Sequence, residues 1–225
     1  DGSPDACPAI LDEYAARDSR FKVIHKENGG ASSAKNAGIQ IAKGEYCIYL
    51  DSDDILHPQT LEICEFMARR DNSDIVAYTY NRVYKTCLRI RHKLHIPDPK
   101  RIHFRKYVPS KVPYVLTDNI FDWASEIDYH GVCPNRKMLV KHCQAWRCMY
   151  RTSIVKDIRF IDGIIYEDFP WWGEVMLNTH RTTIINLPLY FYYPNSSSLL
   201  NSSSQQKLID SLRIATKASR ALFDS

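Results

Sequence analysis

Residues 44–54 read GEYCIYLDSDD, an apolar run that ends abruptly in acidic residues. The part from Tyr46 to Leu50 shows no polar alternation, which is typical of a central parallel strand buried on both faces. It stops at Asp51-Ser52-Asp53-Asp54. In an open parallel sheet, ligands collect outside the carboxyl ends of the strands. The stretch therefore predicts an α/β protein with a site at this edge of its sheet.

The sequence on either side of this stretch supports alternating helices and strands. Before it, we expect an amphipathic helix over residues 5–17, a strand at Phe21–His25 and a second helix after the turn at residues 27–30. After it, we expect a helix over 58–70 and a strand over 75–80. This alternation predicts βαβ units that build a parallel sheet. The second of these helices has a narrow face of small residues that is expected to pack closely on the sheet, namely Ala34, Ala37, Gly38, Ile41 and Ala42.

The second half of the chain is less regular. Residues 185–193 alternate between aliphatic or aromatic and other side chains, which predicts one half-buried strand. A serine-rich loop follows, and a last helix begins near residue 205. The length of 225 residues suits one α/β domain, and 44% hydrophobic residues with 25% charged residues exclude a disordered chain. No apolar run reaches the roughly 20 residues that span a bilayer.

The seven cysteines are an odd number and include no C-x-x-C pair. This pattern indicates neither a zinc site nor a disulfide framework. We therefore expect free thiols and a reducing, cytoplasmic compartment.

The net charge of +4 is unevenly distributed along the chain. Residues 82–111 hold ten Lys and Arg side chains against one acid, Asp98. A segment this basic favours an anionic partner, such as a phosphate-bearing substrate, an acidic membrane surface or a nucleic acid. A solvated polar insertion explains it equally well.

Two acidic clusters are candidates for chemistry. Asp51 and Asp53 are alternate carboxylates that can approach one Mg²⁺ or Mn²⁺ shared with a diphosphate; helix capping would need only one acid, so we favour the metal. Glu167-Asp168 precedes Phe169-Pro170-Trp171-Trp172, and a carboxylate beside aromatic rings is suited to act as a general base. An N-cap with Pro170 in the first helical turn explains the second cluster equally well.

Two glycine-containing segments lie in the first part of the chain. Ser32, Ser33, Lys35 and Asn36 lie at a predicted helix N-terminus, which suits phosphate or sugar hydroxyls, or else they only form a tight turn and a closely packed helix. Asp1-Gly2-Ser3 is a turn that by itself says little. The paired tryptophans suit a sugar face.

Taken together and in order, these motifs resemble the family-two glycosyltransferases of the GT-A fold. The resemblance rests on Asp1-Gly2-Ser3, residues 24–30 (IHKENGG), residues 34–38 (AKNAG), residues 44–46 (GEY), residues 50–54 (LDSDD) and Tyr166-Glu167-Asp168. It is dense from Asp1 to Pro58 and resumes between Tyr150 and Asp168. It implies a GT-A (Rossmann-like) α/β fold with a mainly parallel sheet flanked by helices.

The resemblance implies an inverting, metal-dependent hexosyltransferase-type enzyme of bacterial surface polysaccharide synthesis. It would move a sugar from a nucleotide diphosphate sugar, expected to be UDP-linked, to a saccharide or lipid-linked acceptor. Asp168 would be the base, with Glu167 beside it. Asp51 and Asp53, the DXD motif, would hold Mn²⁺ or Mg²⁺. The predicted nucleotide-sugar contacts are Asp1, which would meet the base, Gly2, Ser3, Asn28, Gly30, Lys35 on the phosphate side, Asn36, Asp51 and Ser52.

We divide the single domain, residues 1–225, into parts, and the basic charge of its middle segment is the reason to place the acceptor there. Residues 1–82 would bind the nucleotide sugar, residues 83–200 the acceptor, and residues 205–223 form the C-terminal helix. Trp146, Trp171 and Trp172 are the predicted acceptor contacts. The family usually has Arg where Lys35 stands, and Lys lacks the bidentate fork. The family's first βα unit would precede Asp1, so we expect residues 1–225 alone to bind donor poorly or not at all.

Two other functions remain open from sequence. One is a non-catalytic module that binds a nucleotide sugar or saccharide. The other is a nucleic-acid binder that uses residues 82–111, which we do not expect because their order fits no recognition module. We expect that basic segment to give a cytoplasmic enzyme peripheral contact with the anionic inner face of a membrane.

Overall fold

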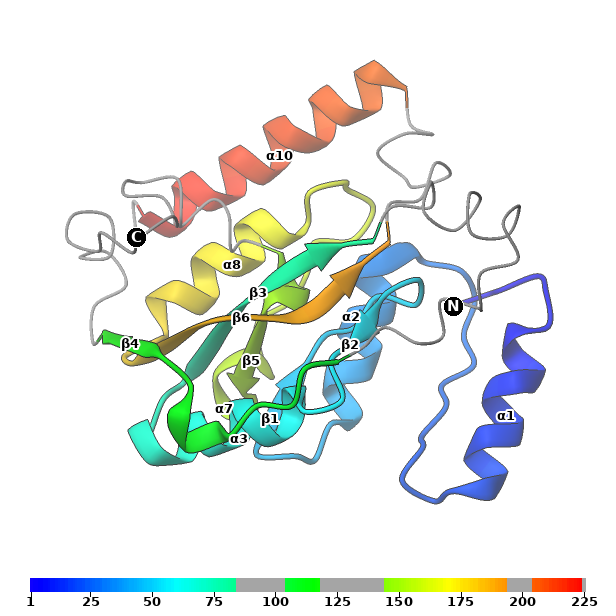
Figure 1. Ribbon diagram of the computed structural model, residues 1–225. Coiled ribbons are helices and arrows are strands. Elements are labelled where there is room, and N and C mark those ends of the chain that lie inside the picture. Colours follow the sequence, from blue (N-terminus) through cyan, green and yellow to red (C-terminus); the bar gives the residue numbers. More distant parts are fainter. Residues whose placement is uncertain (84–103, 118–143, 194–203, 224–225) are drawn as a thin grey trace, which may run out of the picture.

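The computed structural model describes residues 1–83, 104–117, 144–193 and 204–223 (Figure 1). Its helices are α1 (Cys7–Arg17), α2 (Gly30–Ile41), α3 (Thr60–Asp71), α7 (Thr152–Val155), α8 (Asp168–Leu177) and α10 (Gln205–Phe223), with short 3-10 turns at Pro109–Lys111 and Ala145–Arg147. Its strands are β1 (Tyr46–Ile48), β2 (Ile55–Leu56), β3 (Ile75–Arg82), β4 (Tyr114–Thr117), β5 (Cys148–Arg151) and β6 (Thr182–Tyr192).

These six strands form one mixed sheet in the order β1-β5-β3-β6-β2, with β4 also paired to β6. Strands β3 and β6 run parallel, and every other pairing is antiparallel. The outer edge of β6 pairs first with β4 and then with β2. Strand β2 directly follows the acidic turn at residues 51–54. Its pairing with β6 therefore places the end of this acidic turn next to the central strands of the sheet.

Helices cover both faces of this sheet. Successive side chains of a strand point to opposite faces, and both faces carry apolar side chains that pack against helices, so there are two cores. On β3, Ile75 and Ala77 belong to one core, with Trp171 and Val175 of α8. Val76 and Tyr78 point to the other face and meet α3. Helix α10 lies outside α8, as Figure 1 shows. The result is a layered α/β protein, and the predicted fold class is confirmed.

Several predicted elements match the structure, with boundaries shifted by a few residues. Helix α1, helix α3, strand β3, strand β6 and helix α10 all lie where the sequence predicts them. Strand β6 is buried on both faces at residues 189–191, rather than half-buried, because it lies between β3 and β2. The cysteines in the described part of the chain, Cys7, Cys47, Cys64 and Cys148, are free thiols as expected.

The sheet differs from the predicted one in its order. Strand β1 was expected to be a central parallel strand, but it pairs antiparallel with β5 and lies at one end of the described order. The cause is β5, which comes from the second half of the chain and lies between β1 and β3. Consecutive strands are therefore not neighbours, so the parallel sheet expected from residues 1–80 is reduced to the pair β3 and β6.

The N-terminal residues contribute little to either core. None of residues 1–31 is buried, and α1 stands apart from the layers, on the side where α2 lies (Figure 1). Residues 21–25 form no strand, because no described strand lies alongside to bond their backbone. The small-residue face of α2 does not pack on the sheet as predicted: Ile41 is 44% exposed, and the buried side chains of this helix are Ser32 and Ile39.

Candidate active site

Lys35 brings together two segments that are far apart in the sequence. Its Nζ atom, on α2, lies 2.8 Å from Glu167 Oε1 and 3.1 Å from Asp168 Oδ1 at the start of α8. The three side chains are only 15–18% exposed. The ammonium also lies 4.9 Å from the centre of the Phe160 ring, a cation–π distance. The lysine is therefore fixed between two carboxylates and an aromatic face.

Burial and charge set the protonation of this cluster. Burial raises the pKa of Asp168 to about 6, although the Lys35 ammonium opposes the rise. Burial alone would lower the pKa of Lys35, but the charges of Asp168 and Glu167 outweigh it, so that pKa is raised. Lys35 is thus charged at neutral pH, while Asp168 titrates close to neutrality. A carboxylate of that basicity is suited to accept a proton.

Asp51 lies near this cluster, at the turn that follows β1. Burial raises the pKa of Asp51, and the charge of Lys35 counteracts it. Asp51, Ser52 and Lys35 line a cavity of about 530 Å³ between α2 and the residues after β1. The predicted base and the predicted acidic motif are therefore both linked to Lys35.

The local alternatives of helix capping do not fit the structure. Asp168 is the first residue of α8, its carboxylate accepts a bond from Lys35, and the N-cap residue Glu167 makes no side-chain cap bond. Helix α3 is preceded by Gln59, not by an aspartate, and the Asp54 carboxylate bonds to Tyr190 and Tyr193 instead. Neither acidic cluster makes a side-chain cap bond to a helix.

The N-terminal donor residues form a second group. Asp1 Oδ1 accepts bonds from Lys26 Nζ at 2.6 Å and from the Gly29 amide at 3.0 Å, while Oδ2 accepts the Gly30 amide at 3.0 Å. Gly2 has φ of +64°, and a Cβ there would lie 2.8 Å from the backbone nitrogen of Asn28. The structure thus joins Asp1, Gly2, Asn28 and Gly30 at the N-terminus of α2, whereas Ser3 is exposed.

Asn36 and Ser32 have partners within the protein. The Asn36 amide bonds the backbone of Phe160 in both directions, at 2.9 Å each, and the Ser32 hydroxyl donates to the Ile161 carbonyl at 2.8 Å. These bonds fasten α2 to the segment before α8. The donor contact predicted for Asn36 is not supported, because its amide already bonds main chain.

The acceptor role predicted for three tryptophans is not supported either. Trp171 and Trp172, which belong to α8, are 1% and 5% exposed, and their side chains lie in the core between this helix and the sheet. Trp146 is 9% exposed, and both Tyr190 and Tyr192 stack on it. Their rings present no free face to a sugar. The pattern Pro-Trp-Trp identified buried helix residues rather than a binding platform.

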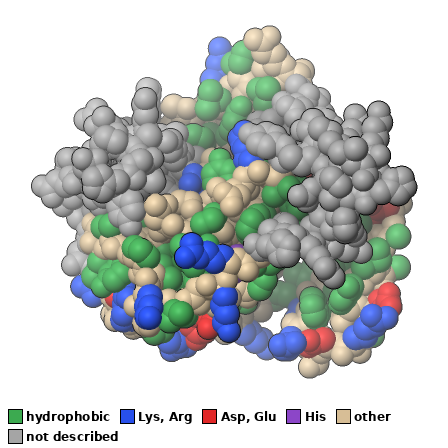
Figure 2. All heavy atoms as spheres, viewed as in Figure 1, with side chains coloured by type: hydrophobic (Ala, Val, Ile, Leu, Met, Phe, Trp, Pro, Cys, Tyr) green, Lys and Arg blue, Asp and Glu red, His purple; other side chains and the backbone are tan. Residues whose placement is uncertain are grey.

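The basic segment falls largely outside the described residues, since residues 84–103 are not among them. Within its described part, Arg105, Lys106 and Lys111 are exposed. Figure 2 shows more Lys and Arg than Asp and Glu on one face of the molecule. Contact with an anionic membrane and a cytoplasmic location stay predictions. No helix in the described ranges has the length and apolar character to cross a membrane.

Comparison with solved structures places the fold in a known class. The chain is similar to Staphylococcus aureus TarS, solved in complex with UDP-GlcNAc, with a TM-score of 0.64 and 18% identity over 97% of this chain and 55% of that one. At this identity the likeness concerns the fold alone. The layered α/β arrangement is that of a GT-A glycosyltransferase, as the motifs implied.

Sequence comparison gives the family. The chain is 42% identical over 209 residues to glycosyltransferase GlyG of Streptococcus pneumoniae, covering 89% of this chain and 61% of that protein. Chondroitin synthase of Pasteurella multocida is 38% identical over 82 residues, covering 36% of this chain and 8% of that protein. Residues 1–157 match the family described as "Glycosyl transferase family 2". The chain belongs to glycosyl transferase family 2, and it spans only part of the length of these relatives.

Sequence reasoning missed Tyr190, which bonds both ends of the acidic turn. The available signal was a tyrosine at a position where the alternation of residues 185–193 predicts an outward side chain. It also missed that Lys35 is an internal ion-pair partner.

Proposed function

We propose that the protein transfers a sugar, with inversion, from a UDP-linked donor to a saccharide or lipid-linked acceptor in surface polysaccharide synthesis. The observation that supports this most is the largely buried cluster of Lys35, Glu167 and Asp168, next to Asp51 and the cavity that Asp51 lines. It combines a carboxylate of raised pKa with a fixed positive charge close to a cavity, and perturbed groups of this kind are concentrated at functional sites.

In the proposed reaction, Asp168 accepts the proton of the acceptor hydroxyl. The acceptor oxygen forms a bond to the anomeric carbon while the bond from that carbon to the diphosphate oxygen breaks. The electron pair leaves with the nucleotide diphosphate, and the proton stays on Asp168. Lys35 keeps the two carboxylates in place and lowers the pKa of Asp168 relative to burial alone, so the base is largely ionised at neutral pH.

The residues of the acidic turn fit a divalent cation in part. Among the described residues, no group of three or more His, Cys, Asp and Glu side chains could hold a metal by itself. Asp51 and Asp53 offer two hard carboxylates, and Mg²⁺ is commonly bound by one or two carboxylates together with substrate phosphates. A cation held there with the donor would offset the charge that the departing diphosphate gains.

The relatives support the donor and the class of acceptor. TarS is solved with UDP-GlcNAc, and chondroitin synthase is named for a polysaccharide. Both names concern those proteins, and their similarity to this chain makes a UDP-sugar and a saccharide acceptor the first compounds to assay.

Nucleotide binding by the full-length protein tests the proposal. Unfolding temperatures would be compared with UDP, GDP, CDP and TDP, each with and without Mn²⁺. We expect UDP with Mn²⁺ to stabilise the folded protein more than the other nucleotides do. At a UDP concentration one hundred times its dissociation constant, the free energy of unfolding should rise by about 2.7 kcal/mol. The same protein would then be assayed for consumption of UDP-sugars with saccharide acceptors. Binding without turnover would favour a non-catalytic module, and no response to any nucleotide would refute the donor assignment.

A further inference from the structure

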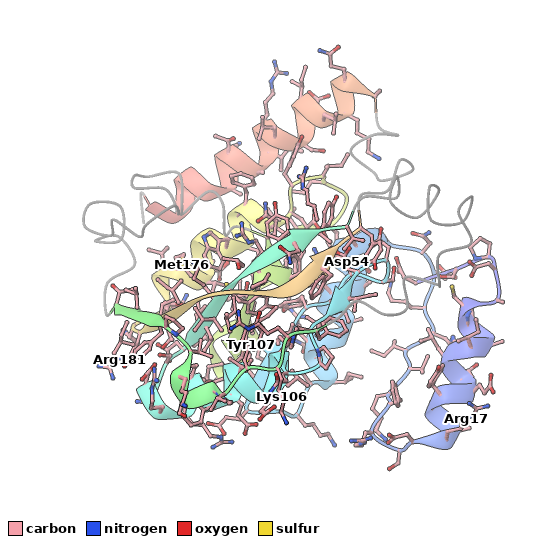
Figure 3. The ribbon with its side chains drawn as sticks, viewed as in Figure 1. Arg17, Asp54, Lys106, Tyr107, Met176 and Arg181 are labelled. Atoms are coloured by element: carbon pink, nitrogen blue, oxygen red, sulfur yellow. The ribbon has the colours of Figure 1, made fainter. Side chains whose placement is uncertain are left out.

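The acidic turn is tied to the core at both of its ends. The Tyr190 hydroxyl donates to Asp54 Oδ2 at 2.7 Å and accepts the Asp51 amide at 3.3 Å. Asp54 Oδ1 accepts the Tyr193 amide at 2.7 Å, and the Asp54 amide bonds the Asp51 carbonyl at 3.1 Å. In Figure 3, Asp54 lies where β2 and β6 meet. Between the two tied residues stand Ser52 and Asp53, which are exposed.

Tyr190 is itself held rigidly, independently of the turn. Its side chain is fully buried, and its ring stacks on Trp146 with 4.4 Å between centroids. Its backbone lies in β6, paired with Leu56 on one side and Tyr80 on the other. The position of its hydroxyl is therefore set by the sheet and the aromatic core, and the turn adapts to it.

We propose that Tyr190 is a positioning residue that pre-arranges the Asp51 and Asp53 carboxylates for a divalent cation. The inference rests on the proposed function, in which those carboxylates hold the ion. One hydroxyl joins the Asp51 backbone to the Asp54 carboxylate, so it fixes the separation of the two ends of the turn. A turn fixed in advance loses less conformational entropy when the ion and the diphosphate bind. Partners that orient metal-binding groups typically contribute 10- to 100-fold to metal affinity.

Tyr190→Phe removes this hydroxyl and keeps the ring that stacks on Trp146. A matched control is Tyr78→Phe, because Tyr78 is also fully buried in this sheet and donates a bond of 2.8 Å, but to the Trp146 carbonyl. Tyr78→Phe loses one buried hydroxyl bond, and Tyr190→Phe loses the two bonds that its hydroxyl makes to the turn, so both variants remove buried hydroxyl bonds from the same sheet. Only the Tyr190 variant frees the turn.

The test measures free Mn²⁺ by electron paramagnetic resonance during titration of the full-length protein, with UDP present, together with transfer kinetics. We expect Tyr190→Phe to raise the Mn²⁺ dissociation constant about 10-fold. Transfer should then recover largely at saturating Mn²⁺, and Tyr78→Phe should leave the constant unchanged. Asp54→Asn, which weakens the same tie from the other side, should act in the same direction, and it serves as the test if Tyr190→Phe does not fold.

Two results would overturn the inference and separate it from the proposed function. If wild-type protein binds Mn²⁺ with UDP but Tyr190→Phe and Asp54→Asn bind it equally well, Tyr190 has no positioning role and the cation site stands. If Tyr78→Phe weakens Mn²⁺ as much as Tyr190→Phe, the effect is general destabilisation. If wild-type protein binds no Mn²⁺ and transfers sugar without it, the cation role fails and the inference fails with it.

Discussion

The Asp51–Asp54 turn and the Glu167–Asp168 pair are both acidic, but different groups hold them. The turn is held by neutral donors, namely the Tyr190 hydroxyl and backbone amides. The pair is held by the Lys35 ammonium at 2.8 and 3.1 Å. Within the described residues, Asp51 and Asp53 form no ion pair.

Under the proposed function, this difference would give the two clusters distinct chemistry. Neutral hydrogen bonds to the Asp51 amide and the Asp54 carboxylate fix the turn without cancelling its charge, which would suit it to the cation of the proposed function. A buried ammonium instead neutralises part of the charge of its partners and adjusts their pKa, so the pair is suited to proton transfer. In that proposal the same residue type would serve two purposes, depending on whether its partner is charged.

The largest effect is expected from Asp168→Asn, which removes the proposed base and preserves the shape of its side chain. Transfer should fall by about 10²- to 10⁴-fold, while UDP binding survives. The measurement is transfer at saturating donor beside UDP titration by calorimetry. Asp162→Asn, the same change at an exposed position nearby, is the control and should be near wild type. Unchanged turnover in Asp168→Asn would remove this residue from the mechanism.

Asp53→Ala should affect the other cluster and leave the base intact. Loss of one direct charged ligand should weaken Mn²⁺ binding by about 30-fold, equivalent to about 2 kcal/mol. Mn²⁺ titration in the presence of UDP measures it, and the pH profile of the remaining activity should keep its shape. Asp157→Ala, at an exposed aspartate, is the matched control. Equal Mn²⁺ affinity in both variants would show that the turn does not hold the cation.

Lys35→Met tests whether the ammonium adjusts the base. Asp168 has a pKa of about 6 with Lys35 beside it, and that charge lowers it. Without Lys35 the pKa should rise, so activity should increase with pH at higher values than in wild type. The acidic limb of the pH profile of kcat measures this, with Lys156→Met as an exposed-lysine control. Lys35→Arg keeps a positive charge, so the acidic limb of its kcat profile should lie close to that of wild type. If the acidic limb of Lys35→Met lies at the same pH as in wild type, Lys35 does not adjust the pKa of the base.

The sequence alone predicted the α/β class and most helices and strands, because those follow from local periodicity. It failed at residues 21–25 and on the face of α2, since burial there depends on what lies alongside. It also could not show that β5 lies between β1 and β3, which is a long-range pairing.

The same distinction applies to the site. Asp51, Glu167 and Asp168 were identifiable because acids at element ends form a local pattern. That Lys35 reaches α8, and that Tyr190 reaches the turn, depends on contacts between residues more than 130 positions apart. The burial of Trp171 and Trp172 was not foreseen, because the sequence pattern does not reveal which side of a helix the core covers.

The smallest effect concerns stability and pH. The folded-state pKa of Asp168, about 6, exceeds its ordinary value of 3.8. Between those pH values the folded protein binds more protons than the unfolded chain. The contribution of Asp168 to the free energy of unfolding is therefore largest below pH 3.8, and it is lost as the pH rises to about 6. Asp168→Asn has no carboxyl group that titrates at this position. Between pH 3.8 and about 6, the free energy of unfolding of the wild-type protein should therefore fall by about 1–2 kcal/mol more than that of Asp168→Asn, after allowance for partial exposure. Urea unfolding of both proteins at pH 4, 5, 6 and 7 measures it. A difference between Asp168→Asn and wild type that is constant with pH would place the titration elsewhere.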